Sequence, residues 1–153
     1  RCYLQTQLLH QYKKSLISFT LNIPGPVKVL TDVPEAFASG CQRIETLLKD
    51  RLVLIQHMET IKEKTGYEAF YSVDANPDFI KELMVSLEDQ DRLGRLFDID
   101  VLRPDGSKVS REDMGSAPRT CLLCGQPAHV CSRSRRHSVA ELTAEIGKIL
   151  SGL

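Results

Sequence analysis

The chain has 153 residues, 42% of them hydrophobic and 26% charged, so it is long enough to bury a sizeable core in one domain. Its 20 basic residues balance its 20 acidic residues, and this zero net charge argues against non-specific binding to nucleic acid. It has no apolar run of membrane-spanning length and no signal-peptide pattern at its start. We therefore expect a cytoplasmic protein with no membrane partner.

The first part of the chain is expected to form a helix followed by a strand. Leu4, Leu8 and Leu9 recur at helical spacing over residues 1–12, and residues 16–23 form an apolar run typical of a strand. A tight Pro-Gly-Pro turn then ends the strand at residues 24–26.

This turn is a candidate phosphate contact. Asn22 precedes it, Gly25 lies at its centre and Lys28 follows it. A glycine turn with a nearby lysine can hold a phosphate. An ordinary strand exit with a solvated lysine has the same pattern, so the turn by itself leaves both interpretations open.

The middle of the chain predicts a helix and a hairpin. Asp32 is a plausible N-cap with Glu35 three residues later, and a helical apolar pattern continues to about Asp50. Residues 52–63 could extend this helix, but we favour a strand because Lys64-Thr65-Gly66 resembles a hairpin turn into a second strand over residues 68–73.

The following segment predicts shorter elements. Asn76-Pro77 breaks the chain, and we expect a short helix over residues 78–82 and a strand over residues 83–88. A turn at residues 103–106 would return the chain antiparallel over residues 108–110. Near the C-terminus, Ser138-Val139-Ala140-Glu141 is a capping box that starts a final helix.

The stretch Leu93-Gly94-Arg95-Leu96-Phe97-Asp98-Ile99-Asp100-Val101 carries the strongest catalytic signal. It predicts a short buried strand, on which Asp98 and Asp100 share one face and Ile99 lies on the other. Two neighbouring carboxylates repel each other, and a divalent cation is the usual compensation. Gly94 permits a close approach of backbone or substrate, and Arg95 adds a planar cation. A solvated strand face would show the same Asp-x-Asp spacing.

A second candidate site is the Cys-rich segment, residues 119–137, with the spacing Cys121-x2-Cys124-x6-Cys131-x5-His137. Three thiolates and an imidazole could complete a tetrahedral zinc site. Reduced thiols packed under a loop, His129 as the fourth ligand, and redox chemistry of the Cys-x-x-Cys pair are the alternatives. The odd count of five cysteines, without a secretion signal, favours a reducing compartment.

Three stretches together resemble one known family. They are residues 22–28, residues 93–101, and the run from Arg119 through the cysteines and Arg133 to His137. In order and spacing they are similar to apo-citrate lyase phosphoribosyl-dephospho-CoA transferase, the holo-acyl-carrier-protein synthase of citrate lyase. The family pattern includes His137 but not His129. Family chains begin further upstream than Arg1, so we expect this chain to be truncated at its N-terminus.

The resemblance implies an activity of the nucleotidyltransferase type. Enzymes of this family attach the phosphoribosyl-dephospho-CoA group of 2′-(5″-triphosphoribosyl)-3′-dephospho-CoA to a serine of the acyl-carrier subunit of apo-citrate lyase, and pyrophosphate leaves. A sister synthase for another carrier, such as that of malonate decarboxylase, would look similar. A non-enzymatic module that presents arginines on a zinc element to nucleic acid is the alternative from another class.

From these observations we assign candidate roles. The catalytic candidates are Asp98 and Asp100, which would hold Mg²⁺ or accept the serine proton, and Arg95, which would neutralise the triphosphate. Arg133, Arg135 and Arg136 could form a docking patch for an acidic carrier, although a solvated face would also explain them. The candidate substrate contacts are Asn22, Gly25, Lys28, Gly94, Arg119, Arg133 and His137.

We expect an α+β fold in which helices pack on a mixed, mostly antiparallel sheet. The Cys-rich segment and the last helix would lie together at one edge of that sheet. The expected cofactors are Mg²⁺ at the paired acids and a structural Zn²⁺ at the cysteine cluster.

Overall fold

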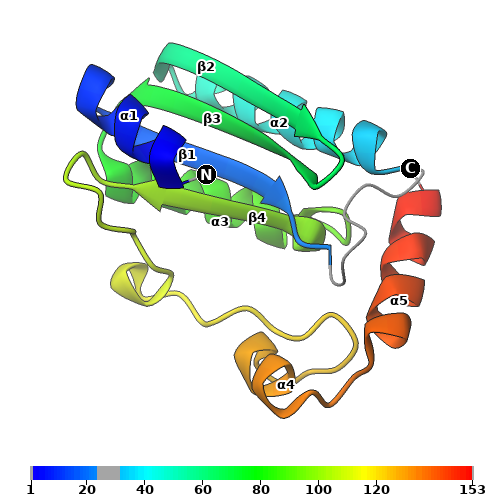
Figure 1. Cartoon of the computed structure of the whole chain (residues 1–153). Helices are drawn as coiled ribbons and strands as arrows, with labels where there is room; N and C mark the ends of the chain where they lie inside the picture. The colour runs from blue at the N-terminus through cyan, green and yellow to red at the C-terminus, as the bar shows by residue number, and fades with distance from the viewer. Residues whose placement is uncertain (1, 24–31, 153) are drawn as a thin grey trace.

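A computed structural model of the protein describes residues 2–23 and 32–152. It contains a four-stranded sheet of order β2-β3-β1-β4, with helices packed against it (Figure 1). Every strand pair described is antiparallel, so the α+β expectation is confirmed and the sheet is simpler than the mixed one expected. The elements in chain order are α1 (Cys2–Tyr12), β1 (Ser15–Leu21), α2 (Val33–Asp50), β2 (Leu54–Glu63), β3 (Gly66–Asp74), α3 (Pro77–Asp89), η1 (Gly94–Leu96), β4 (Phe97–Leu102), η2 (Glu112–Met114), α4 (Ala128–Ser134) and α5 (Val139–Ser151).

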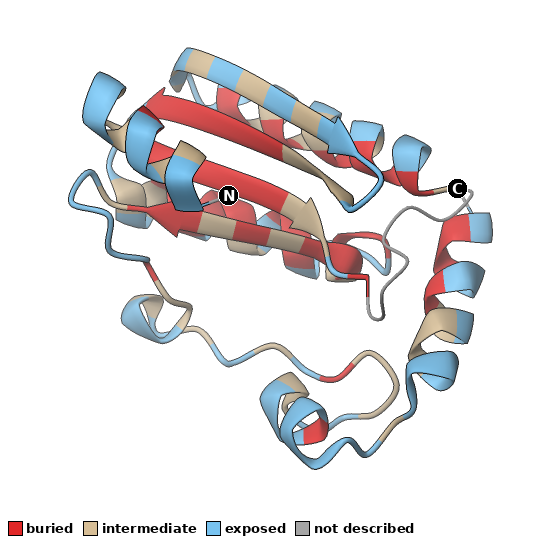
Figure 2. Ribbon diagram, in the orientation of Figure 1, coloured by how far each residue is buried: buried red, intermediate tan, exposed pale blue. Residues whose placement is uncertain are grey.

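The main core lies between the sheet and helices α2 and α3. Alternate residues of the strands point into it, including Ile17 and Phe19 of β1 and Ile99 of β4. Helix α5 adds Ile146 and Ile149 to the same core, although it lies beside the sheet in Figure 1. Figure 2 shows this burial as an almost continuous run of buried residues along β1 and β3.

The opposite face of the sheet is covered only in part. Helix α1 packs Leu8 against Leu16 of β1, Phe70 of β3 and Leu102 of β4. Beyond these apolar contacts the face carries polar side chains, which form the candidate site described below. In the described part of the chain, no helix is both long and apolar enough to cross a membrane.

Helix α3 corrects one sequence-based prediction, because the strand expected over residues 83–88 is wrong. The side chain of Asn76 accepts a hydrogen bond of 2.8 Å from the backbone N–H of Asp78, and Pro77 occupies the first turn. Ile80, Leu83, Met84 and Leu87 are buried, at the spacing of one helical face. The helix therefore continues through the segment and buries that face against the sheet.

The other predicted elements differ from the structure mainly at their ends. The ambiguous segment 52–63 is the strand β2, as favoured, and the capping box at Ser138 and Glu141 forms both of its hydrogen bonds. Asp32 occupies the expected N-cap position without a side-chain hydrogen bond to the helix. The expected antiparallel return over residues 108–110 forms a single bridge, between Leu102 and Lys108.

The strand predicted over residues 93–101 begins only at Phe97, because residues 94–96 form the short helix η1. Asp91 accepts a hydrogen bond of 2.8 Å from the backbone N–H of Gly94 and thereby closes this turn. Gly94 is buried, and a Cβ atom there would collide with the carbonyl oxygen of Leu87 in α3. The glycine therefore permits backbone to approach backbone just before β4.

We expect Gly94→Ala to lower the free energy of unfolding by about 1–3 kcal/mol, because the added methyl group must displace the end of α3. Denaturant unfolding measures this change. Gly147→Ala is the matched control, since a Cβ atom at that helical position meets no neighbouring atom within 4 Å. Equal midpoints for the two variants would show that the contact at Gly94 is relaxed in solution.

Candidate active site

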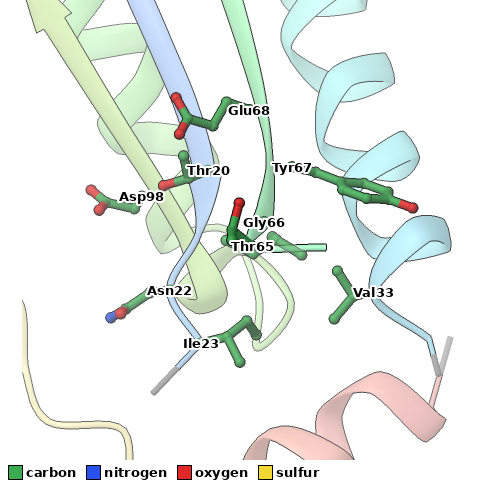
Figure 3. Close-up of a pocket in the computed structure, with 10 residues that line it drawn as sticks. Thr20, Asn22, Ile23, Val33, Thr65, Gly66, Tyr67, Glu68 and Asp98 are labelled. Carbon is green, nitrogen blue, oxygen red and sulfur yellow. The ribbon is translucent and has the colours of Figure 1, made fainter. Parts of the chain in front are cut away.

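Polar side chains from three neighbouring strands form a row across the open face of the sheet. Thr20 of β1 pairs with Glu68 of β3 on one side and with Asp98 of β4 on the other. Directly paired residues of antiparallel strands point to the same face, and Figure 3 shows these three side chains next to one another. Two residues along β1, Ser18 pairs with Asp100. The structure thus places three carboxylates and two hydroxyls on one face of the sheet, where Ser18 is buried beneath Gln5 of α1.

The two acids of β4 share a face, as their spacing predicts. Phe97, Ile99 and Val101 are buried in the main core, whereas Asp98 and Asp100 are half-buried on the opposite side. The ammonium group of Lys108 lies 3.5 Å from Asp100 Oδ2. Lys108 therefore pairs with Asp100, one of the two acids.

A pocket of about 240 Å³ opens at this row. Thr20, Glu68 and Asp98 line it together with Asn22 and the turn of the β2–β3 hairpin at residues 65–66 (Figure 3). Thr20, Glu68 and Asp98 lie on strands, so these three polar side chains are held on rigid elements.

Two charged side chains of α3 are buried against the free edge of β4. The ammonium group of Lys81 donates a hydrogen bond of 3.0 Å to the carbonyl oxygen of Ile99, and Glu88 Oε2 accepts one of 3.0 Å from the N–H of the same residue. Burial lowers the pKa of Lys81, although the nearby Glu88 opposes this shift. Arg111 donates to Glu88 Oε1 at 2.7 Å. Lys81 and Glu88 thus provide hydrogen-bond partners for the backbone groups of Ile99 at the outer edge of β4, the strand that carries both acids.

Two arginines attach the Cys-rich segment to the start of β4. Arg95 Nη2 donates to the carbonyl oxygens of Thr120 and Cys121, at 2.8 and 3.0 Å. Arg119 donates in return to the carbonyl oxygens of Phe97 and Arg95, at 2.8 and 2.6 Å. The expectation that Arg95 lies on the same strand as the acids is wrong, because it belongs to η1. A contact between Arg95 and substrate stays a prediction.

A second, larger pocket of about 560 Å³ lies between these arginines, the Cys-rich segment and α5. Arg95, Arg119 and Arg135 supply positive charge, and Leu122, Leu142 and Ile146 supply apolar surface. Asn22 lines both pockets and therefore lies between the two cavities. A cavity that combines cations with apolar walls suits a ligand that carries both phosphates and an apolar body.

The cysteine cluster forms one wall of the larger pocket. Cys121, Cys131 and His137 line it, and Cys124 Sγ lies 3.5 Å from Cys131 Sγ without a disulfide. The neighbouring His137 side chain lowers the pKa of the Cys124 thiol to about 6. Burial raises the pKa of Cys131 to about 11.

The structure brings together only some of the residues predicted from sequence. Asn22 lies between the pockets, and Arg119 and His137 line the larger one. Arg133 is exposed on α4 and lines neither pocket. Gly25 and Lys28 lie outside the described residues.

Sequence reasoning missed Glu68, Thr20 and Glu88. Glu68 lies near the start of β3, and only the pairing of β3 with β1 and of β1 with β4 brings it close to Asp98. Glu88 falls within the segment mistaken for a strand. Recognising α3 as one long helix would have shown Lys81 and Glu88 seven residues apart on the same face as its apolar residues.

A carboxylate-bearing sheet face beside a pocket of arginines and apolar side chains is typical of enzymes that handle phosphorylated substrates. Comparison with known proteins identifies the group of enzymes. The sequence matches the family described as "Apo-citrate lyase phosphoribosyl-dephospho-CoA transferase" over residues 1–152. The chain belongs to this family of transferases.

Individual relatives agree with the family match. A protein of Streptococcus pyogenes serotype M18, named "Probable apo-citrate lyase phosphoribosyl-dephospho-CoA transferase", is 38% identical over 98% of this chain and 79% of its own length. A protein of the same name from Vibrio cholerae serotype O1 (strain M66-2) is 37% identical over 93% of this chain and 80% of its own length. "Protein CitXG" of Leuconostoc mesenteroides subsp. cremoris is 34% identical over 95% of this chain but only 32% of its own length.

Proposed function

We propose that this protein transfers the 2′-(5″-phosphoribosyl)-3′-dephospho-CoA group from its triphosphate precursor to a serine of the acyl-carrier subunit of apo-citrate lyase. Pyrophosphate is the leaving group. The family match over residues 1–152 supports the transferase activity. The single structural observation that supports this chemistry is the placement of Asp98, Asp100 and Glu68 on one open face of the sheet.

The reaction is a displacement at phosphorus, of the nucleotidyltransferase type. The serine Oγ forms a bond to the phosphorus that bears the ribose, and the bond from that phosphorus to the pyrophosphate oxygen breaks with its electron pair. The serine proton moves to a carboxylate, for which Asp98 and Asp100 are the candidates because both are half-buried on a rigid strand. Positioning and charge neutralisation govern such a displacement.

The carboxylates of Asp98 and Asp100 have the donor chemistry that Mg²⁺ prefers, since they are hard oxygen ligands placed side by side. We propose that these two residues hold the ion, with Glu68 in the adjoining position of the row. When bound, Mg²⁺ would neutralise charge on the triphosphate. The residues also supply a fixed anionic surface that an approaching serine hydroxyl can meet.

The two pockets suggest where the two ends of a long substrate would bind. The triphosphoribosyl end would lie in the pocket that Asp98 lines, and the dephospho-CoA body would extend past Asn22 into the larger pocket. There Arg119 and Arg135 would contact the diphosphate, and the apolar wall of α5 would contact the adenine ring. This arrangement leaves the open sheet face for the serine of the carrier.

Arg133 and Arg136 are exposed beside the larger pocket and are proposed as the docking patch for the acidic carrier. We expect the double variant Arg133→Gln, Arg136→Gln to raise KM for the carrier several-fold at low salt, because the steering charge is lost. Rising ionic strength should weaken binding of the carrier to the wild type, so the difference in KM between wild type and double variant should become smaller. Steady-state kinetics with varied carrier measures this, and Lys49→Gln, at an exposed position of α2, is the control. If KM for the carrier changes neither with salt concentration nor with loss of the arginines, the patch is a solvated surface with no role in docking.

Mass spectrometry of the apo-carrier tests the proposed function directly. Incubation with this protein, 2′-(5″-triphosphoribosyl)-3′-dephospho-CoA and Mg²⁺ should add the mass of the prosthetic group to one serine and release pyrophosphate. A carrier with that serine changed to alanine should stay unmodified. The carrier of malonate decarboxylase, assayed in parallel, identifies a sister transferase if it is the one modified. An unmodified citrate lyase carrier would overturn the proposal.

A further inference from the structure

The Cys-rich segment folds so that its three cysteines and His137, which are separated in sequence, come close together. Thr120 pairs with Pro127 across a short hairpin, which the N–H of Cys121 closes by donating to the carbonyl oxygen of Gln126 at 2.7 Å. Cys121 and Cys124 lie on this hairpin, and Cys131 follows one turn into α4. Arg135 has a positive φ of 52°, which ends α4 and turns the chain so that His137 returns to the cysteines.

The resulting cluster has the dimensions of a metal centre. One ligand atom from each of Cys121, Cys124, Cys131 and His137 lies within 4.8 Å of every other. Zinc–sulfur bonds of about 2.3 Å in a tetrahedron place sulfur atoms about 3.8 Å apart. The 3.5 Å between Cys124 Sγ and Cys131 Sγ is close to that separation and far longer than a disulfide bond.

Few apolar contacts hold this segment in shape. Between residues 119 and 137, Cys121 and Cys131 are the buried residues, and their surroundings are intermediate or exposed. A hairpin and a seven-residue helix cannot bury enough apolar surface to offset the entropy of ordering them. In small elements of this kind a bound metal commonly supplies the missing stability.

The histidine provides an independent indication. His137 Nε2 is buried and has no well-aligned hydrogen-bond partner in the described part of the chain. The other ring nitrogen, Nδ1, lies 3.9 Å from Glu141 Oε2. A ring with one nitrogen facing a carboxylate and the other facing thiols is the usual setting of a zinc-bound histidine. His129, the competing ligand, is exposed and does not join the cluster.

We propose that Cys121, Cys124, Cys131 and His137 bind one structural Zn²⁺ in a closed, four-coordinate site, and that Glu141 orients His137. All four positions are taken by protein, so the metal orders the segment and does not activate water. Through Arg95, which contacts the carbonyl oxygens of Thr120 and Cys121, the bound metal also fixes a wall of the larger pocket. Metal binding itself does not depend on the proposed function.

Elemental analysis of the whole protein, purified without chelator, should find about one zinc per chain. Chelation should lower the melting temperature, and readdition of zinc should restore it. Substitution with Co²⁺ should produce the visible absorption of a tetrahedral thiolate centre. A chain without stoichiometric zinc, in which the three clustered thiols react freely while the protein stays folded, would overturn the proposal.

Two variants and a control test the ligand assignment. Cys124→Ser should retain zinc at less than a tenth of the wild-type level after dialysis, whereas Cys2→Ser, at an exposed cysteine outside the cluster, should retain it fully. Glu141→Gln preserves the capping-box pattern of α5 but removes the charge beside His137, so zinc should be about 10- to 100-fold easier to extract with a chelator. Wild-type zinc content in folded Cys124→Ser would also overturn the proposal.

Discussion

Replacing Asp98 or Asp100 by asparagine is expected to reduce carrier modification by about a hundred- to ten-thousand-fold while the protein stays folded. The amide has the shape of the carboxylate but cannot accept the serine proton at neutral pH and is a poorer ligand for Mg²⁺. Both side chains are half-buried on β4, paired with Thr20 and Ser18, so each substitution leaves the strand register intact. Removing one of two neighbouring negative charges also relieves repulsion between them.

The measurement is kcat with saturating carrier and Mg²⁺, combined with a thermal melt of each variant. Glu68→Gln should reduce turnover as well, because Glu68 lies across Thr20 in the same row. Asp50→Asn is the control, since Asp50 is exposed at the end of α2 and lines neither pocket. Near-normal turnover in folded Asp98→Asn and Asp100→Asn would remove both acids from the mechanism.

The largest effect on stability is expected at Glu88, which is only 3% exposed. Its carboxylate accepts hydrogen bonds from the N–H of Ile99 and from Arg111. Arg119 Nη1 lies 3.6 Å from Glu88 Oε2. Glu88→Ala removes the buried counter-charge of Arg111, which keeps only its contacts with the exposed Asp89, and leaves a strand N–H without its acceptor. Loss of one partner from such a buried pair costs about 3–5 kcal/mol.

Denaturant unfolding measures this loss. Because the whole free energy of unfolding of a domain is about 5–15 kcal/mol, Glu88→Ala could reduce the folded population substantially. Glu88→Gln is the milder variant, since its amide oxygen can still accept the hydrogen bond from Ile99. Glu82→Ala, at an exposed position of α3, should be nearly neutral. If Glu88→Ala were no less stable than Glu82→Ala, the buried network would not hold β4 in place.

Several elements could be predicted because their signals are local. The capping box of Ser138 and Glu141 specifies the start of α5, and the turn at residues 64–66 specifies the β2–β3 hairpin. The prediction failed at residues 83–88, where a compact apolar run was taken for a strand although the cap at Asn76 supports a continuous helix. Helix α4 was not anticipated, because it is short and has no side-chain cap.

The candidate site was predicted only in part. The spacing of Asp98 and Asp100 on one strand placed both acids on one face, and the spacing of the cysteines indicated their cluster. Arg95 was expected beside the acids, but the closed turn of η1 lets it reach the carbonyl oxygens of Thr120 and Cys121. No spacing rule could predict that Glu68 lies in the same row as Asp98.

The sequence by itself determined the periodic elements, the paired acids, the cysteine spacing and the family, since each depends on residues close together or on a recognisable order of motifs. The tertiary structure decided which side chains meet. Glu68 joins Asp98 because β1 pairs between β3 and β4, and Glu88 supports β4 because α3 packs along its edge. Strand order and helix packing arise from contacts between residues far apart in the chain, which the chemistry of neighbouring residues does not specify.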